Sequence, residues 1–128
     1  MAKVLGVGGI FFKSADPEKL YQWYERWLGF RGEPGSGFAF LPQNMPKDSV
    51  TVWSAFESTT DYFAPSTKEY MFNLIVDDLR EALRQVKEGG AEILGELEEY
   101  DFGKFGRFMD PDGNKVELWE LPDQAAHS

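Results

Sequence analysis

The chain presents one order of secondary-structure elements twice, and this repeat limits its fold more than any other feature of the sequence. In each half, an apolar stretch typical of a strand precedes an amphipathic stretch typical of a helix, and three further short strand candidates follow. The order is β-α-β-β-β in both halves. We therefore predict an α+β fold made of two βαβββ units, each with a sheet that carries its helix on one side.

The two predicted helices carry matching start and stop signals. Asp16 is a suitable N-cap, Pro17 suits the first helical position, and Gly29 follows the last apolar residue of the first helix. In the second half, Asp78 with a glutamate three residues later forms a capping box, and Gly89 and Gly90 supply the stop. These signals fix the helices at corresponding places in the two units.

The boundaries of the units follow from composition. We place unit one at about 1–56, a polar linker at about 57–68, unit two at about 69–122 and a polar tail at 123–128, all within a single domain. Each sheet has its helix on one face, so the opposite face needs a cover. That cover is the other unit, a ligand or a second chain.

Composition and charge exclude several classes of protein. The chain of 128 residues has no cysteine, a single histidine (His127) in the tail, and a net charge of −9. Disulfides and thiolate ligands are thus excluded, and the negative charge disfavours nucleic acid and anionic membranes as partners. No signal peptide or membrane-spanning segment is recognisable, so we expect a cytoplasmic protein.

The last predicted strand, "KVELWEL", places a carboxylate where an apolar residue would be simpler. Alternation points Val116 and Leu118 to one face and Lys115, Glu117 and Trp119 to the other. Before this strand, "DPDGN" is dense in turn-forming residues. Glu117 is therefore the first candidate for a functional group.

The segments "DPEKLYQWYERWLGF", "VDDL" and "DPDGNKVELWE" resemble the vicinal oxygen chelate superfamily, which includes glyoxalase I, bleomycin-resistance proteins and extradiol dioxygenases. The chain is also similar to a bacterial subgroup that carries "GGIFFK", "MFNLIVDDL" and an "ELWE" ending. The resemblance implies a glyoxalase-like fold, in which curved mixed sheets surround a cleft. It also implies a homodimer, with the units paired within one chain or between two.

The resemblance further implies which positions would line a metal site in this cleft. These are Gly9, Met71, a position near Trp53 to Ala55, and Glu117. Glu117 alone among them carries a ligating carboxylate, and a divalent ion of this type needs several nitrogen or oxygen donors. We therefore predict no metal and no other cofactor, although Glu57 would supply a second carboxylate if the strand register slipped.

Strand parity selects the residues expected to share the cleft face with Glu117. Trp53 and Trp119 suit either a cleft wall or a dimer interface, and Lys13 suits either a partner of Glu117 or a solvated strand end. Glu117 itself either contacts a ligand or is paired structurally with Lys13, Arg107 or Lys115. Phe38 and Phe40 are candidates for the rim. The predicted ligand-binding residues are Phe11, Lys13, Trp53, Met71, Asn73, Arg107 and Trp119.

Three functions are compatible with this lining. The first is a metal-free binding protein for a small aromatic or cationic molecule, as in drug sequestration, because indoles beside a carboxylate suit such a ligand. The second is a lyase, isomerase or dioxygenase in which Glu117 acts as the catalytic base, with or without a divalent metal. The third is a dimeric interaction protein whose own tryptophans fill the cleft.

Overall fold

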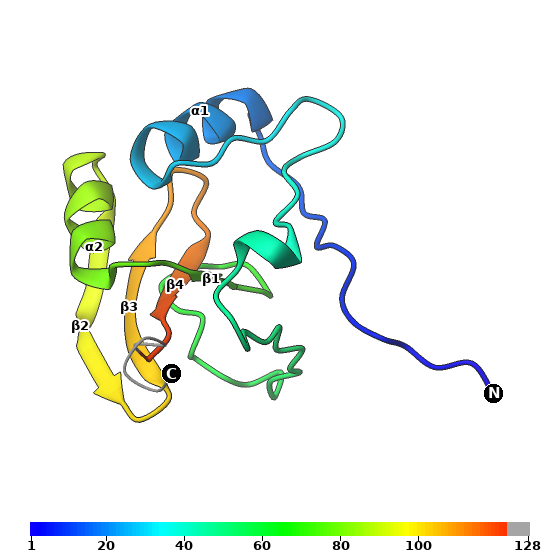
Figure 1. The fold of residues 1–128 in the computed structure, drawn as a ribbon. Helices are drawn as coiled ribbons and strands as arrows, with labels where there is room; N and C mark the ends of the chain where they lie inside the picture. Colours follow the sequence, from blue (N-terminus) through cyan, green and yellow to red (C-terminus); the bar gives the residue numbers. More distant parts are fainter. Residues whose placement is uncertain (123–128) are drawn as a thin grey trace.

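The computed structural model describes residues 1–122, and the predicted polar tail 123–128 with His127 lies outside the described residues. The elements, in chain order, are α1 (Pro17–Leu28), the short 3-10 helix η1 (Pro42–Asn44), β1 (Phe72–Ile75), α2 (Leu79–Glu88), β2 (Glu92–Tyr100), β3 (Gly103–Met109) and β4 (Lys115–Glu120). Helices α1 and α2 pack with the sheet through one hydrophobic core (Figure 1).

Both helices begin and end where the sequence predicts. The Asp16 carboxylate accepts a hydrogen bond from the backbone N–H of Lys19, and Gly29 closes α1 in the left-handed conformation with φ 77°. Asp78 caps α2 in the same way, accepting from the N–H of Glu81 at 3.1 Å. Within residues 1–122, no helix is long and apolar enough to cross a bilayer.

The second half of the chain forms all four predicted strands, which make one sheet in the order β1-β4-β3-β2. β4 is central: it runs parallel to β1 and antiparallel to β3. In this register Glu117 stands directly between Asn73 on β1 and Arg107 on β3. The open, curved sheet with two helices confirms the predicted α+β class.

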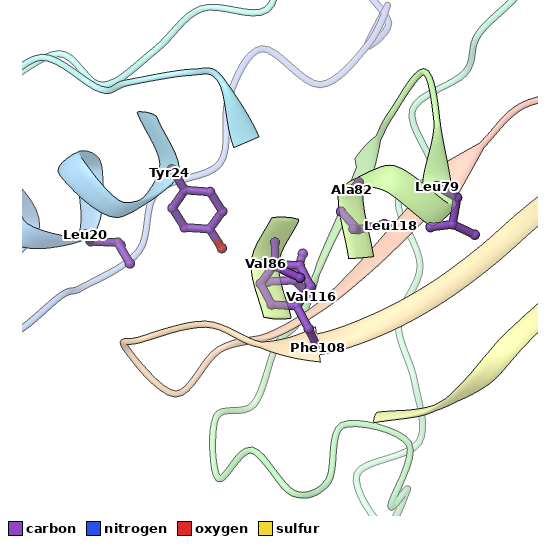
Figure 2. Close-up of a cluster of buried hydrophobic side chains, with 8 residues drawn as sticks. All are labelled: Leu20, Tyr24, Leu79, Ala82, Val86, Phe108, Val116 and Leu118. Carbon is purple, nitrogen blue, oxygen red and sulfur yellow. The ribbon is translucent and has the colours of Figure 1, made fainter. Parts of the chain in front are cut away.

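The hydrophobic core lies between the sheet and the two helices. Figure 2 shows the side chains that meet there from α1, α2, β3 and β4. Val116 and Leu118 are fully buried in this core, together with Phe108 of β3. Because side chains alternate along a strand, burying these residues turns Lys115, Glu117 and Trp119 to the opposite face, as predicted.

A buried polar cluster joins α1 to the β3–β4 turn. Asp110 accepts hydrogen bonds from the Tyr24 hydroxyl at 2.8 Å, from the Asn114 side chain at 2.9 Å and from the backbone N–H of Asn114 at 2.9 Å. Gly113 occupies the left-handed region of this turn with φ 82°. The cluster fixes the turn and hence the register of the two strands that it connects.

The first half differs from the sequence prediction in its strands. Unit one contributes α1, but residues 4–12, 38–42 and 49–56 form no ladder in the single chain; the first half contains one isolated bridge, Glu33 to Gly37. The N-terminal segment runs away from the body of the molecule (Figure 1). An extended segment needs a neighbouring strand to pair its backbone groups, and none of these segments forms a ladder with another strand in this conformation.

Candidate functional site

The face of the sheet opposite the helices forms an open groove with a volume of about 790 Å³. One part of its lining is aromatic and the other part is charged, a combination typical of small-molecule sites. Residues of β2, β3, β4 and the linker between the two halves contribute. The lining residues are Asp61, Tyr62, Glu98, Tyr100, Phe102, Phe105, Arg107, Lys115 and Glu117.

Glu117 lies in this groove with both carboxylate oxygens occupied. Its Oε1 accepts a hydrogen bond from the Asn73 amide at 2.8 Å. Its Oε2 accepts from the Tyr62 hydroxyl at 2.8 Å and from Nε of Arg107 at 3.0 Å. The side chain is only 15% exposed. The carboxylate is therefore neutralised by a guanidinium and held in one orientation by two further donors.

Arg107 bridges two carboxylates across the floor of the groove. Its guanidinium pairs with Glu117 on one side and with Glu98 on the other, and its side chain is 16% exposed. Burial lowers the pKa of Arg107, but the hydrogen bond to Glu98 and the negative charges around it outweigh this effect and raise the pKa above its ordinary value. Arg107 is thus a permanent cation whose charge is already compensated.

Tyr62, which lies in the linker between the two halves, packs its ring over the charged residues of the floor. Its ring lies 5.8 Å from the Arg107 guanidinium carbon and 4.6 Å from the Lys115 ammonium, within the range of cation–π attraction. Burial, and then the hydrogen bond to Glu117, raise the pKa of the Tyr62 phenol. The hydroxyl therefore remains protonated at neutral pH and acts as a donor to Glu117.

Aromatic rings line the end of the groove at the β2–β3 hairpin. Tyr100 and Phe102 are stacked in parallel, with centroids 5.2 Å apart and an interplanar angle of 7°. Phe105 lies beside them and stacks on Trp119, with centroids 5.6 Å apart. The Trp119 indole donates a hydrogen bond to the backbone carbonyl of Phe102 at 3.0 Å. We call these four rings the aromatic wall.

Four of the predicted site residues come together at this groove. Glu117 and Arg107 line it, Asn73 binds Glu117, and Trp119 supports the aromatic wall. Met71 lies partly buried just before β1 and is not part of the lining.

Three other predicted residues belong to the unpaired first half. Phe11 is 96% exposed, Trp53 is 86% exposed, and Lys13 is also exposed. A binding role for these three remains a prediction. Phe38 and Phe40, the candidates for the rim, pack instead on Phe30.

Sequence reasoning did not identify Tyr62, Glu98, Tyr100, Phe102 and Phe105. Phe105 stands two residues before Arg107 on β3 and therefore shares its face. Tyr62 lies in a segment that was treated only as a linker. Its aromatic character in a polar stretch was the available signal.

The metal that the resemblance implies does not fit the residues present. Among residues 1–122, no group of three or more His, Cys, Asp or Glu side chains is arranged to hold an ion. Glu117 is bound by a phenol, an amide and a guanidinium, and the positive charge of Arg107 at 3.0 Å opposes a divalent cation at the same oxygen.

The family model described as a glyoxalase-like domain matches residues 9–119, which is most of the chain. No curated protein matches significantly.

Several solved structures are similar to the chain. A protein from the mobile metagenome of V. Pseudocholerae is 20% identical, with a TM-score of 0.52, and the match covers 94% of this chain and 100% of that one. This match shows a shared fold.

Two further structures match less closely in shape. A member of the glyoxalase/bleomycin resistance protein/dioxygenase superfamily from Sphaerobacter thermophilus DSM 20745 is 32% identical with a TM-score of 0.35, and the match covers 38% of this chain and 40% of that one. An antibiotic-binding protein from Streptomyces sp. CB03234 is 18% identical with a TM-score of 0.48, over 85% of this chain and 89% of that one.

A double-mutant cycle tests whether the Arg107–Glu117 pair holds the floor of the groove. Arg107→Met, Glu117→Gln and the double variant are unfolded in urea, and we expect a coupling energy of about 1–2 kcal/mol because the pair is largely shielded from solvent. The control is the exposed pair Arg84–Glu88 on α2, for which we expect no measurable coupling. Equal coupling in the two cycles would contradict this description.

Proposed function

We propose that this chain, which belongs to the glyoxalase-like domain family, binds a small aromatic molecule in the groove of its sheet without the help of a metal. The stacked aromatic wall beside a polar floor is the observation that carries this proposal. A planar ring lies favourably against such rings, and the floor orients its polar substituents. Stoichiometric binding without turnover, as in drug sequestration, is the role that follows. A cytoplasmic location is part of the same proposal.

The state of Glu117 favours binding over catalysis. A general base needs a carboxylate that can turn to the substrate proton. Both oxygens of Glu117 already accept hydrogen bonds, and Arg107 forms an ion pair with it. For the same reason, Glu117 is a weak receptor for a cationic ligand. We therefore commit to an aromatic ligand and keep a lyase or dioxygenase role as the weaker hypothesis.

Calorimetric titration with 2-naphthamide and 2-naphthoate, which share one ring system, tests this proposal. We expect one-to-one binding of at least one probe, unchanged by EDTA. Phe102→Ala should weaken both probes about tenfold, because it removes an exposed ring of the aromatic wall with little effect on the core.

The control for this titration is Tyr21→Ala, which removes a ring from α1 on the helical side of the sheet. This variant should bind as the parent does. Failure of both probes to bind, or equal losses in the two variants, would contradict the proposed function.

We also propose that the protein is a homodimer in which the first-half strand segments pair with a second copy. Exposed apolar side chains on these segments need a cover, among them Val4, Leu5, Val52 and Trp53. β1 lies at the edge of the sheet, so one side of Phe72–Ile75 has no strand partner among residues 1–122. An unpaired edge of this kind accepts another strand.

Sedimentation equilibrium tests the homodimer. We expect twice the 14.6 kDa mass of the chain, and a shift to monomer in Val52→Asp, because the new charge would be buried against the second copy. Thr67→Asp, at an exposed polar position outside these segments, should remain dimeric. A monomeric parent protein at micromolar concentration is the result that rules out this part of the proposal.

A further inference from the structure

Lys115 is a buried cation in the groove, and no acidic side chain of residues 1–122 forms an ion pair with it. Only 8% of the residue is exposed, and it lines the groove on the same face of β4 as Glu117. Within residues 1–122, its ammonium forms no ion pair with an aspartate or glutamate. It donates a hydrogen bond to the backbone carbonyl of Tyr62 instead. An ammonium has three N–H donors, so donors remain for another acceptor.

Two acidic groups act on Lys115, and neither forms an ion pair with it. Glu117 accepts from Asn73, Tyr62 and Arg107, and Asp61 lines the groove beyond ion-pair distance. The positive charge of Arg107 is matched twice, whereas that of Lys115 is matched by a neutral carbonyl and the face of the Tyr62 ring. A buried charge normally has a charged partner, and no acidic side chain of residues 1–122 forms an ion pair with Lys115.

The electrostatic balance at Lys115 agrees with this description. Burial, followed by repulsion from Arg107, lowers the pKa of the Lys115 ammonium. Glu117 and Asp61 act in the opposite direction without offsetting that effect. Both acids lie beyond ion-pair distance, so the surroundings leave the ammonium less stable than it is in water.

We propose that Lys115 is a subsite for a carboxylate, and that the ligand of the groove is an aromatic acid. This inference rests on the proposed function and specifies its ligand class. Lys115, Glu117 and Trp119 follow one another on the groove face of β4, so the backbone positions of Lys115 and Trp119 lie roughly 13 Å apart. A ring against the aromatic wall can therefore extend its carboxylate toward the ammonium at the other end.

The ligand class is tested with three probes that share a ring system and differ in charge: 2-naphthoate, neutral 2-naphthamide and cationic 2-naphthylmethylammonium. We expect calorimetry to show that the parent protein binds 2-naphthoate about 10- to 100-fold more tightly than the amide. The reason is the charge-assisted hydrogen bond between the carboxylate and the Lys115 ammonium, which is shielded from water. The cationic probe should bind most weakly, because its ammonium is repelled by the ammonium of Lys115.

Variants assign the preference to Lys115. Lys115→Met should bring the affinity for 2-naphthoate down to that for 2-naphthamide, while the affinity for the amide stays within about twofold. The matched control is Lys104→Met, which removes the same charge from the other face of the sheet, where Lys104 faces Glu120 at 3.6 Å. This control should keep the full preference. Lys115→Gln replaces Lys115→Met if the latter does not fold.

The outcomes separate this inference from the proposed function. Equal affinity for the three probes, or a preference for 2-naphthoate that survives in folded Lys115→Met, overturns the carboxylate subsite and leaves an aromatic groove intact. If none of the three probes binds, the proposed function fails and this inference fails with it. If Lys115→Met loses the preference for 2-naphthoate and Lys104→Met keeps it, the result supports both the carboxylate subsite and the proposed function.

Discussion

The register between β3 and β4 is the constraint on which the site depends. It places Arg107 opposite Glu117, while the parallel pairing with β1 brings Asn73 to the other side of the same carboxylate. Asp110 fixes this register because its carboxylate accepts hydrogen bonds from Asn114, at the other end of the connecting turn, and from the Tyr24 hydroxyl of α1. A slip of one residue would turn Glu117 into the core and Val116 into the groove, so the buried cluster and the site are coupled through the backbone.

Charge compensation then decides what the groove can do. Glu117 occupies the position at which the resemblance implies a metal ligand, but here a guanidinium, an amide and a phenol surround it. Together these three groups provide the positive charge and the hydrogen bonds that a bound cation would otherwise supply to Glu117. They hold the carboxylate in place and keep the floor of the groove polar. Lys115 is the cation of the groove that forms no ion pair within residues 1–122, and it donates to a backbone carbonyl instead. The net charge of the whole chain, −9, would favour a cationic ligand. The groove, in our proposal, prefers an anionic one.

The sequence predicts the second unit well, because each of its signals is local. The cap at Asp78, the turn before Lys115 and alternation along β4 all act over a few residues, and they suffice to place Glu117 on the groove face. The partners of Glu117 depend on contacts distant in sequence. Tyr62 reaches it from a linker 55 positions away in the chain, and no periodicity marks such a residue. The strands predicted for the first unit do not pair in the single chain, and local patterns do not specify which strand edge an extended segment would pair with.

Native mass spectrometry of the purified protein, sprayed from ammonium acetate with and without prior EDTA treatment, tests the central claim most directly. A carboxylate held by Arg107, Asn73 and Tyr62 predicts chains without a bound divalent ion in both samples, and an organic adduct, where one co-purifies, that EDTA does not remove. One divalent ion per chain, present before the chelator and absent after it, would contradict the account of how Glu117 is held.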